Sequence, residues 1–257
     1  MNDIISLNIW QFAIVYLLLL VVLLVMKKCR INQTKLLIIA SIRMTVQLVL
    51  AGLILTYIFE NPHPIFTACY VLLITIFAIF IVLRKNRTIN RKFKLISATS
   101  LAISGLSIIC FFIMAIVGVS IFNPQYTIPI SGMIMGNAMT GVSLGLKAFN
   151  ENVGSQKAQI DTLINMGITP RKILTPFVNR AIETALLPTL NSMLGVGIVS
   201  LPGMMTGQIL SGTMPMTAIL YQIAILISIS AVACLAVFCS LYFGCRTLYN
   251  EKSQMIV

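Results

Sequence analysis

Two copies of one short motif carry side-chain amides inside long apolar runs. They occupy Gly132–Asn137 and Gly203–Gln208, lie 71 positions apart, and share the pattern Gly-Met-x-x-Gly followed by an amide residue. A proline, Pro129 or Pro202, stands shortly before each copy. Glycine and proline weaken a regular helix, and a buried amide without a hydrogen-bond partner costs about 1–3 kcal/mol. The two copies therefore predict interrupted helices whose amides face polar partners or a wet lumen, as along a substrate route.

The same region is rich in methionine and glycine. The motif methionines offer thioether sulfur, a soft ligand that suits Cu(I) better than Fe(III), but they also give flexible apolar packing. We interpret them as packing side chains, with a soft metal or a metal complex as the alternative substrate. Glycines at four- and five-residue spacing let helices approach closely. We expect this role of Gly132, Gly136, Gly141, Gly145, Gly203 and Gly207.

Catalytic chemistry has no visible residues in this sequence. It contains no Gly-x-x-x-x-Gly-Lys-Ser/Thr phosphate loop, no His-Glu-x-x-His motif and no carboxylate pair inside an apolar run. The six cysteines lack the Cys-x-x-Cys spacing and are interpreted as small buried apolar residues. The single histidine, His63, is a poor metal site by itself. We therefore predict that the chain is not an enzyme, and we assign no metal ligand.

Composition places the chain in a membrane. Apolar residues make up 58% of its 257 residues, charged residues make up 9%, and the mean hydropathy is +0.99. Soluble domains carry roughly 25% charged residues, and one membrane span needs about 20 apolar residues. We predict an all-α integral membrane protein that forms a single transmembrane permease domain over residues 1–257. Seven spans are expected, at 10–26, 36–59, 65–83, 95–121, 128–149, 181–201 and 215–243.

The distribution of basic residues predicts the orientation. When the first loop, which begins with Lys27 and Lys28, is placed in the cytosol, seventeen of the eighteen Lys and Arg residues become cytosolic. Because cytosolic loops carry the excess of Lys and Arg, the amino terminus is expected outside and the carboxyl terminus in the cytosol. The net charge of +12 is split among short loops, so it orients the protein in a lipid bilayer and forms no groove for nucleic acid.

The longest polar stretch, residues 150–180, is expected to be a cytosolic loop holding two short helices joined by an elbow. Gly167 suits a helix C-cap, and Pro170 suits the first position of the next helix. The run from Asp161 to Gly167 is similar to the loop by which bacterial ABC permeases contact their ATPase. We interpret Asp161, Gly167, Pro170 and Arg171 as part of such a coupling loop. An amphipathic helix on the inner leaflet is the alternative.

Arg43 is the one basic residue that falls inside a predicted span. It lies seven residues past Leu36, close enough to the inner face for its long side chain to snorkel to the cytosol. Gln47 follows one turn later on the same helical face, and Glu183 is expected at a comparable depth. A pair between Arg43 and Glu183 inside the bundle is therefore a hypothesis, and snorkelling of Arg43 is the alternative.

Three segments carry a resemblance to a known family. They are Arg43–Leu48, Ile128–Thr140 and Val199–Gly212, together with Tyr221 and Gln222, and the string Leu-Pro-Gly-Met-Met-Thr-Gly-Gln in the third segment is specific. The chain resembles the FetB-type iron-export ABC permeases, which are related to plant permeases linked to aluminium tolerance. The resemblance runs from about Arg43 to the seventh predicted span.

The resemblance implies a membrane subunit that assembles with a separate ABC ATPase. ATP would be used by that partner, and this chain would bind no cofactor. We further expect a homodimer of permease chains in the bacterial cell membrane that exports iron or a related metal species. Two alternatives stay open: an ATPase-independent channel or facilitator, and an ABC permease for a non-metal solute such as a nucleotide sugar. The predicted substrate pathway comprises Arg43, Gln47, Met133, Asn137, Met139, Met204, Met205, Gln208 and Gln222.

Overall fold

The computed structural model describes residues 9–86 and 89–249, and this part of the chain is helical, with no β-strand. Four of its helical segments are long and apolar enough to cross a membrane: Thr34–Glu60, Pro64–Lys85, Arg91–Val117 and Pro215–Cys245. The predicted all-helical, multi-pass class is therefore confirmed. Seven crossings and the orientation of the termini stay predictions. Asp3, Arg87, Glu251 and Lys252, which enter the net charge given above, lie outside the described residues.

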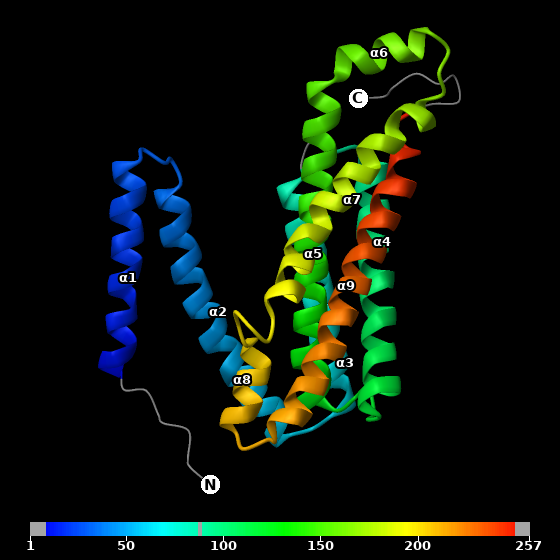
Figure 1. Cartoon of the computed structure of the whole chain (residues 1–257). Coiled ribbons are helices and arrows are strands. Elements are labelled where there is room, and N and C mark those ends of the chain that lie inside the picture. Colours follow the sequence, from blue (N-terminus) through cyan, green and yellow to red (C-terminus); the bar gives the residue numbers. More distant parts are fainter. Residues whose placement is uncertain (1–8, 87–88, 250–257) are drawn as a thin grey trace. The chain divides into compact units, whose positions relative to one another are not determined.

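The chain divides into two compact units. The first unit comprises Met1–Pro62 and Leu210–Gly212, and the second comprises His63–Ile209 and Thr213–Val257. In the first unit, helix α1 (Ile9–Lys28) and helix α2 (Thr34–Glu60) form a hairpin, in which the hydroxyls of Tyr16 and Thr45 lie 2.5 Å apart. Figure 1 shows both helices in blue.

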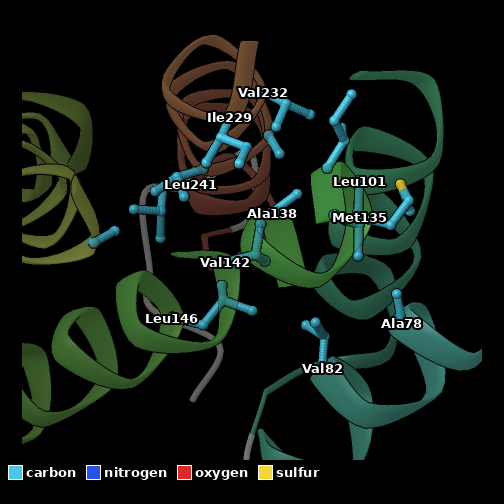
Figure 2. Close-up of a cluster of buried hydrophobic side chains, with 14 of the residues drawn as sticks. Ala78, Val82, Leu101, Met135, Ala138, Val142, Leu146, Ile229, Val232 and Leu241 are labelled. Carbon is cyan, nitrogen blue, oxygen red and sulfur yellow. The ribbon is translucent and has the colours of Figure 1, made fainter. Parts of the chain in front are cut away.

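The second unit is built around helix α5. In chain order it contains α3 (Pro64–Lys85), α4 (Arg91–Phe111), the π-helical segment η1 (Phe112–Val117), α5 (Pro124–Ser155), α6 (Lys157–Asn165), α7 (Pro170–Gly195), α8 (Gly203–Leu210) except for its last residue, and α9 (Pro215–Cys245). Helix α5 contacts α3, α4, α7 and α9. Figure 2 shows the resulting core, in which Met135, Ala138, Val142 and Leu146 of α5 lie among buried side chains of α3, α4 and α9.

Local sequence explains where these helices begin. Helices α3, α5, α7 and α9 start at Pro64, Pro124, Pro170 and Pro215 respectively, where the missing N–H of proline costs no helical hydrogen bond. The side chains of the residues before Pro64 and Pro124 also accept a hydrogen bond from a first-turn N–H, as N-caps do. Proline is thus the first residue of four of the long helices of the second unit, whereas α4 begins at Arg91.

The elements that carry basic residues meet at one end of the second unit. The end of α3, the start of α4, helix α6, the start of α7 and the end of α9 lie together at the top of Figure 1, while α8 and the start of α9 lie at the opposite end. Charged residues avoid hydrocarbon and gather at a membrane face. The basic helix ends of the second unit are therefore placed where one cationic membrane face would be expected.

One expectation about the two motif copies needs correction. The first motif copy does not interrupt a helix, since α5 runs through Pro129 and Gly132 without a break. Pro129 stands near the start of α5, so its ring disturbs only the first turns, and tertiary contacts offset the low helix propensity of glycine. The second motif copy does lie at an interruption. It forms the separate helix α8, which is eight residues long and about 12 Å in length, too short to cross a bilayer.

The predicted boundaries between residues 150 and 201 also differ from the structure. Helix α5 continues to Ser155, and only α6 is a short separate helix, because the second predicted short helix is the beginning of α7. Helix α7 ends at Gly195, before the predicted end of the sixth span. There the N–H groups of Val199 and Ser200 donate to the carbonyl of Gly195, at 2.9 and 3.2 Å, and close a tight turn. A local turn of this kind has no signal in apolar periodicity.

Candidate functional site

A cavity of about 340 Å³ with several amide and hydroxyl side chains in a largely apolar wall lies within the second unit, between α5, α7 and α9. Each helix contributes one face, because its cavity residues recur at spacings of three or four. The turn after α7 closes one side. The lining residues are Met133, Asn137, Thr140 and Gly141 of α5, Ala185, Pro188, Thr189 and Ser192 of α7, Val196, Ser200 and Pro202 of the turn and the residues that follow it, and Gln222, Leu226 and Ile229 of α9.

Gln222 gives the strongest indication that this cavity binds a polar group. Its side chain is only 3% exposed, and its oxygen Oε1 is buried without a hydrogen-bond partner among the described residues. Leaving a buried acceptor unpaired costs about 1–3 kcal/mol, so we expect water or another occupant of the cavity to donate a hydrogen bond to this oxygen. Because Gln222 lines the cavity, an occupant of the cavity is within reach of this oxygen.

Asn137 lines the same cavity from α5. Its Nδ2 donates to the carbonyl of Met133 in its own helix at 2.8 Å, and no described residue donates to its Oδ1. Thr140, one turn further along, donates its hydroxyl to the carbonyl of Gly136 at 3.0 Å. Both side chains therefore make one hydrogen bond to their own helix as donors, and their oxygens keep lone pairs for a ligand or water.

Helix α7 is weakened where it borders the cavity. Pro188 lies inside α7 and has no N–H, so the carbonyl four residues earlier, that of Thr184, loses its helical hydrogen bond. The hydroxyl-bearing residues Thr189 and Ser192 follow on the cavity face. A locally loosened helix with hydroxyls is typical of a site that must admit polar solutes inside a membrane bundle.

The cavity is suited to polar contact and not to acid–base or redox chemistry. Its polar groups are amides and hydroxyls, and it has no carboxylate, imidazole or thiol among the lining residues. Within residues 9–86 and 89–249, no cluster of three or more His, Cys, Asp or Glu side chains forms a metal centre. Neutral amide and hydroxyl oxygens can contact a hydrated solute or a cation, but they lack the negative charge of the ligands that bind metal ions tightly.

The motif methionines lie in different surroundings. Met133, Met139 and Met204 all pack against the apolar core, and Met205 is buried; Met133 also lines the cavity. Packing therefore accounts for most of the predicted methionines, and Met133 is the one of these four that contacts the cavity. Gln208, the amide of the second copy, is half-buried in α8 and is not among the cavity residues.

The predicted packing glycines fall into two groups. A Cβ added at Gly145 would lie 2.9 Å from Cγ1 of Val237 on α9 and 3.3 Å from Cβ of Ala185 on α7, and one at Gly141 would lie 3.5 Å from Cβ of Ala233. These two glycines permit the close approach of α5 to its neighbours. By contrast, a Cβ at any of the other four would meet no heavy atom of another described element within 4 Å: Gly132, Gly136, Gly203 and Gly207.

Arg43 and Gln47 belong to a different unit from the cavity. Both are exposed on α2 in the first unit, whereas Glu183 is exposed on α7 in the second. The Arg43–Glu183 pair and the place of Arg43 and Gln47 in a substrate pathway stay predictions.

The region predicted to couple to an ATPase contains α6 and the start of α7. Gly167 has a φ of +83°, and the N–H groups of Gly167 and Ile168 donate to the carbonyls of Ile164 and Leu163, at 2.9 and 3.2 Å. This is a Schellman C-cap, as Gly167 predicts. Pro170 is the buried first residue of α7, and Asp161 is exposed on α6. Helices α6 and α7 together line a second cavity of about 320 Å³.

The side chain of Arg171, another of the predicted coupling residues, makes a hydrogen bond within this chain. Its Nη2 donates to the hydroxyl of Tyr242 on α9 at 2.6 Å. The guanidinium therefore holds the start of α7 against the end of α9.

The sequence interpretation missed four polar residues of the cavity. Thr140, Thr189, Ser192 and Ser200 line it together with the predicted Asn137 and Gln222. A signal was present for the helical ones, because Asn137 and Thr140, and likewise Thr189 and Ser192, are three residues apart within predicted spans and so share a helical face. Ser200 lies in the turn after α7, and no helical period indicates it.

Comparison with known proteins agrees with this membrane architecture. Residues 9–249 match the uncharacterised protein family UPF0014. The chain is 34% identical to the UPF0014 membrane protein YjkA of Bacillus subtilis, with 95% of this chain and 98% of the relative covered. It is 32% identical to the probable iron export permease protein FetB of Escherichia coli, with 96% and 94% covered.

A plant relative is also similar over part of the chain. The protein ALUMINUM SENSITIVE 3 of Arabidopsis thaliana is 34% identical, over 60% of this chain and 58% of the relative. No solved structure matches the chain significantly. The relatives named as membrane proteins, the apolar helices and the basic helix ends together describe a multi-pass protein of the bacterial cell membrane. With the family match extending over nearly its whole length, the chain belongs to the UPF0014 family of membrane proteins.

Proposed function

We propose that this chain is the membrane subunit of an ABC transporter that exports iron or a related metal species. The observation that carries the proposal is the cavity between α5, α7 and α9, where the buried Oε1 of Gln222 has no partner in the described part of the chain. A cavity that places polar side chains between membrane helices is the expected feature of a substrate route. The similarity to a protein named a probable iron export permease supports the direction and the substrate.

The cavity chemistry supports transient contact with the substrate. Amide and hydroxyl oxygens, with the thioether of Met133 beside them, replace part of a hydration shell without holding a metal ion tightly. A transporter must release what it binds, so weak neutral ligands suit passage better than a carboxylate cage. The methionine sulfur favours a softer metal, or a metal complex, over bare Fe(III).

The energy source belongs to a partner in this proposal. The chain has no phosphate-binding loop, and helix α6 lies at the end of the second unit where the basic helix ends meet. We assign α6, with its exposed Asp161 and its Gly167 cap, to docking of a separate ATPase that binds and hydrolyses ATP. Two permease chains with two ATPase chains complete the transporter.

Two measurements test this function. The chain is expressed with a tag together with candidate nucleotide-binding subunits from the same bacterium, and we expect one of them to co-purify and to hydrolyse ATP faster with the permease than alone. Cellular iron is then compared with and without the chain, and we expect it to rise when the chain is absent. Transport by the purified chain without any ATPase would instead identify a channel or facilitator. Unchanged iron together with ATP-dependent transport of another solute would refute the substrate assignment alone.

A further inference from the structure

Two arginines converge on one tyrosine at the end of the second unit. Nη2 of Arg171, in the first turn of α7, donates to the hydroxyl of Tyr242 at 2.6 Å, and Nη2 of Arg246, which follows α9, donates to the same hydroxyl at 3.4 Å. Both guanidinium carbons also lie over the Tyr242 ring, 5.6 and 5.1 Å from its centroid. Phe238 stacks on this ring, with the centroids 5.2 Å apart, and so fixes its position.

Neither of these two positive charges is paired with a carboxylate in residues 9–86 and 89–249. Two guanidinium groups drawn to one hydroxyl repel each other, and a cation in the first turn of α7 is opposed by the helix dipole. A bound anion between Arg171 and Arg246 would relieve both penalties at once.

A cavity of about 160 Å³ adjoins the two arginines. Its polar lining residues are Arg171, Arg246, Tyr242, Thr175 and Asn179. The rest of its wall is apolar or aromatic, and consists of Leu174, Val178, Phe238, Cys245 and Tyr249. A ligand that fits this wall must have an anionic head and an apolar body.

The position of the cavity along α9 matches the depth of lipid headgroups. Helix α9 has 31 residues and is about 46 Å long, while the hydrocarbon core of a bilayer is about 30 Å thick. Tyr242 stands three residues before the end of this helix, on the side of the unit where the other basic helix ends meet. Tyrosine and arginine at such a position are typical of a membrane interface.

From this geometry we propose that Arg171, Arg246 and Tyr242 bind the phosphate of an anionic phospholipid. Guanidinium groups bind phosphate through two parallel hydrogen bonds, and basic cavities between membrane helices on the cytosolic side hold anionic headgroups. The acyl chain of the lipid lies along the apolar wall formed by α7 and α9. This site is separate from the substrate cavity, and it gives Arg171 a role other than contact with an ATPase.

The test uses the full chain, purified in mild detergent and stripped of lipid. Phosphatidylglycerol, phosphatidylcholine or inorganic phosphate is added, and bound lipid is counted by native mass spectrometry. We expect the wild type to retain phosphatidylglycerol in preference to phosphatidylcholine. The variant R171Q/R246Q should lose affinity on the order of 30-fold, because each basic side chain near an anionic headgroup contributes roughly a fivefold factor. The variant Y242F, which keeps the ring and loses the hydroxyl, should lose part of the affinity.

The matched control is K172Q/R180Q. It removes the same number of positive charges from the same end of the second unit, but both residues lie on α7 and line the cavity of about 320 Å³ next to α6. We expect it to bind phosphatidylglycerol like the wild type. Equal lipid retention by R171Q/R246Q and the wild type would overturn the proposal, as would an equal loss in the control. Displacement of the lipid by millimolar inorganic phosphate would assign the site to a free phosphate. If R171Q/R246Q cannot be purified, the comparison of Y242F with the control decides.

Discussion

A substitution at Gln222 is expected to affect stability and transport in opposite directions. The substitution Gln222→Leu replaces a buried carboxamide, whose Oε1 lacks a partner among the described residues, by an apolar side chain of similar size. We expect the free energy of unfolding to stay the same or rise, by up to about 1–3 kcal/mol, because an unpaired acceptor is removed. Transport should fall at least severalfold, since the cavity loses a polar contact. Thermal unfolding in detergent and export by whole cells measure the two effects.

Ser228→Ala is the control for this prediction. Ser228 is buried on the same helix, donates to the carbonyl of Ala224 at 2.9 Å, and does not line the cavity. It should leave transport unchanged. If Gln222→Leu lowered the unfolding temperature and left transport intact, the carboxamide would be structural and the assignment of the cavity would fail.

A substitution at Gly145 tests whether the close packing of α5 against α9 and α7 depends on glycine. In Gly145→Ala the new methyl group would lie 2.9 Å from Cγ1 of Val237 and 3.3 Å from Cβ of Ala185, so α5 must move away from α9 and α7. Overpacking of this kind costs about 1–3 kcal/mol. The same change at Gly136 meets no neighbour within 4 Å in the described part of the chain and should be neutral or slightly stabilising. Unfolding of the two variants in detergent provides the comparison, and equal destabilisation would instead place Gly136 at an interface with a second chain.

The next prediction concerns helix α6 and the glycine that caps its C-terminal end. Gly167 has a φ of +83°, and an alanine there costs about 1–2 kcal/mol, whereas asparagine tolerates this conformation better. In the proposed transporter, Gly167→Ala should therefore weaken the stimulation of the partner ATPase severalfold, and Gly167→Asn should keep most of it. Gly154→Ala, the same change in α5 at a position with no neighbour within 4 Å, should have no effect. Full stimulation by Gly167→Ala would remove α6 from the coupling pathway.

Orientation in the bilayer is a property of the whole molecule. Helix α3 has 22 residues and is about 33 Å long, enough to cross the hydrocarbon once, so its two ends must face opposite sides of the membrane. In a chain without its natural cysteines, a cysteine introduced at Asn61 should react with an impermeant thiol reagent from outside intact cells. A cysteine introduced at Lys92, next to the other end of α3, should react only after permeabilisation. The reverse pattern would invert the predicted topology.

Much of the architecture could be predicted because it depends on local sequence. Prolines at the first helix position mark the starts of α3, α5, α7 and α9, and apolar runs give the helices themselves. The Gly167 cap was predictable for the same reason, since a residue that must adopt positive φ is almost always glycine. The continuity of α5 through Pro129 was not predictable, because tertiary contacts outweigh the local preference of proline and glycine.

The sequence by itself determined the membrane class, the cationic ends of the helices, the family and two of the amides that line the cavity, Asn137 and Gln222. Each of these follows from composition or from residues close together in the chain. Only the tertiary structure decided which hydroxyls join those amides, that Gly145 and not Gly136 lies at a helix contact, and that Arg171 meets Arg246 at Tyr242. Residues on separate helices meet according to how those helices rotate and pack, and that depends on contacts between segments far apart in the sequence.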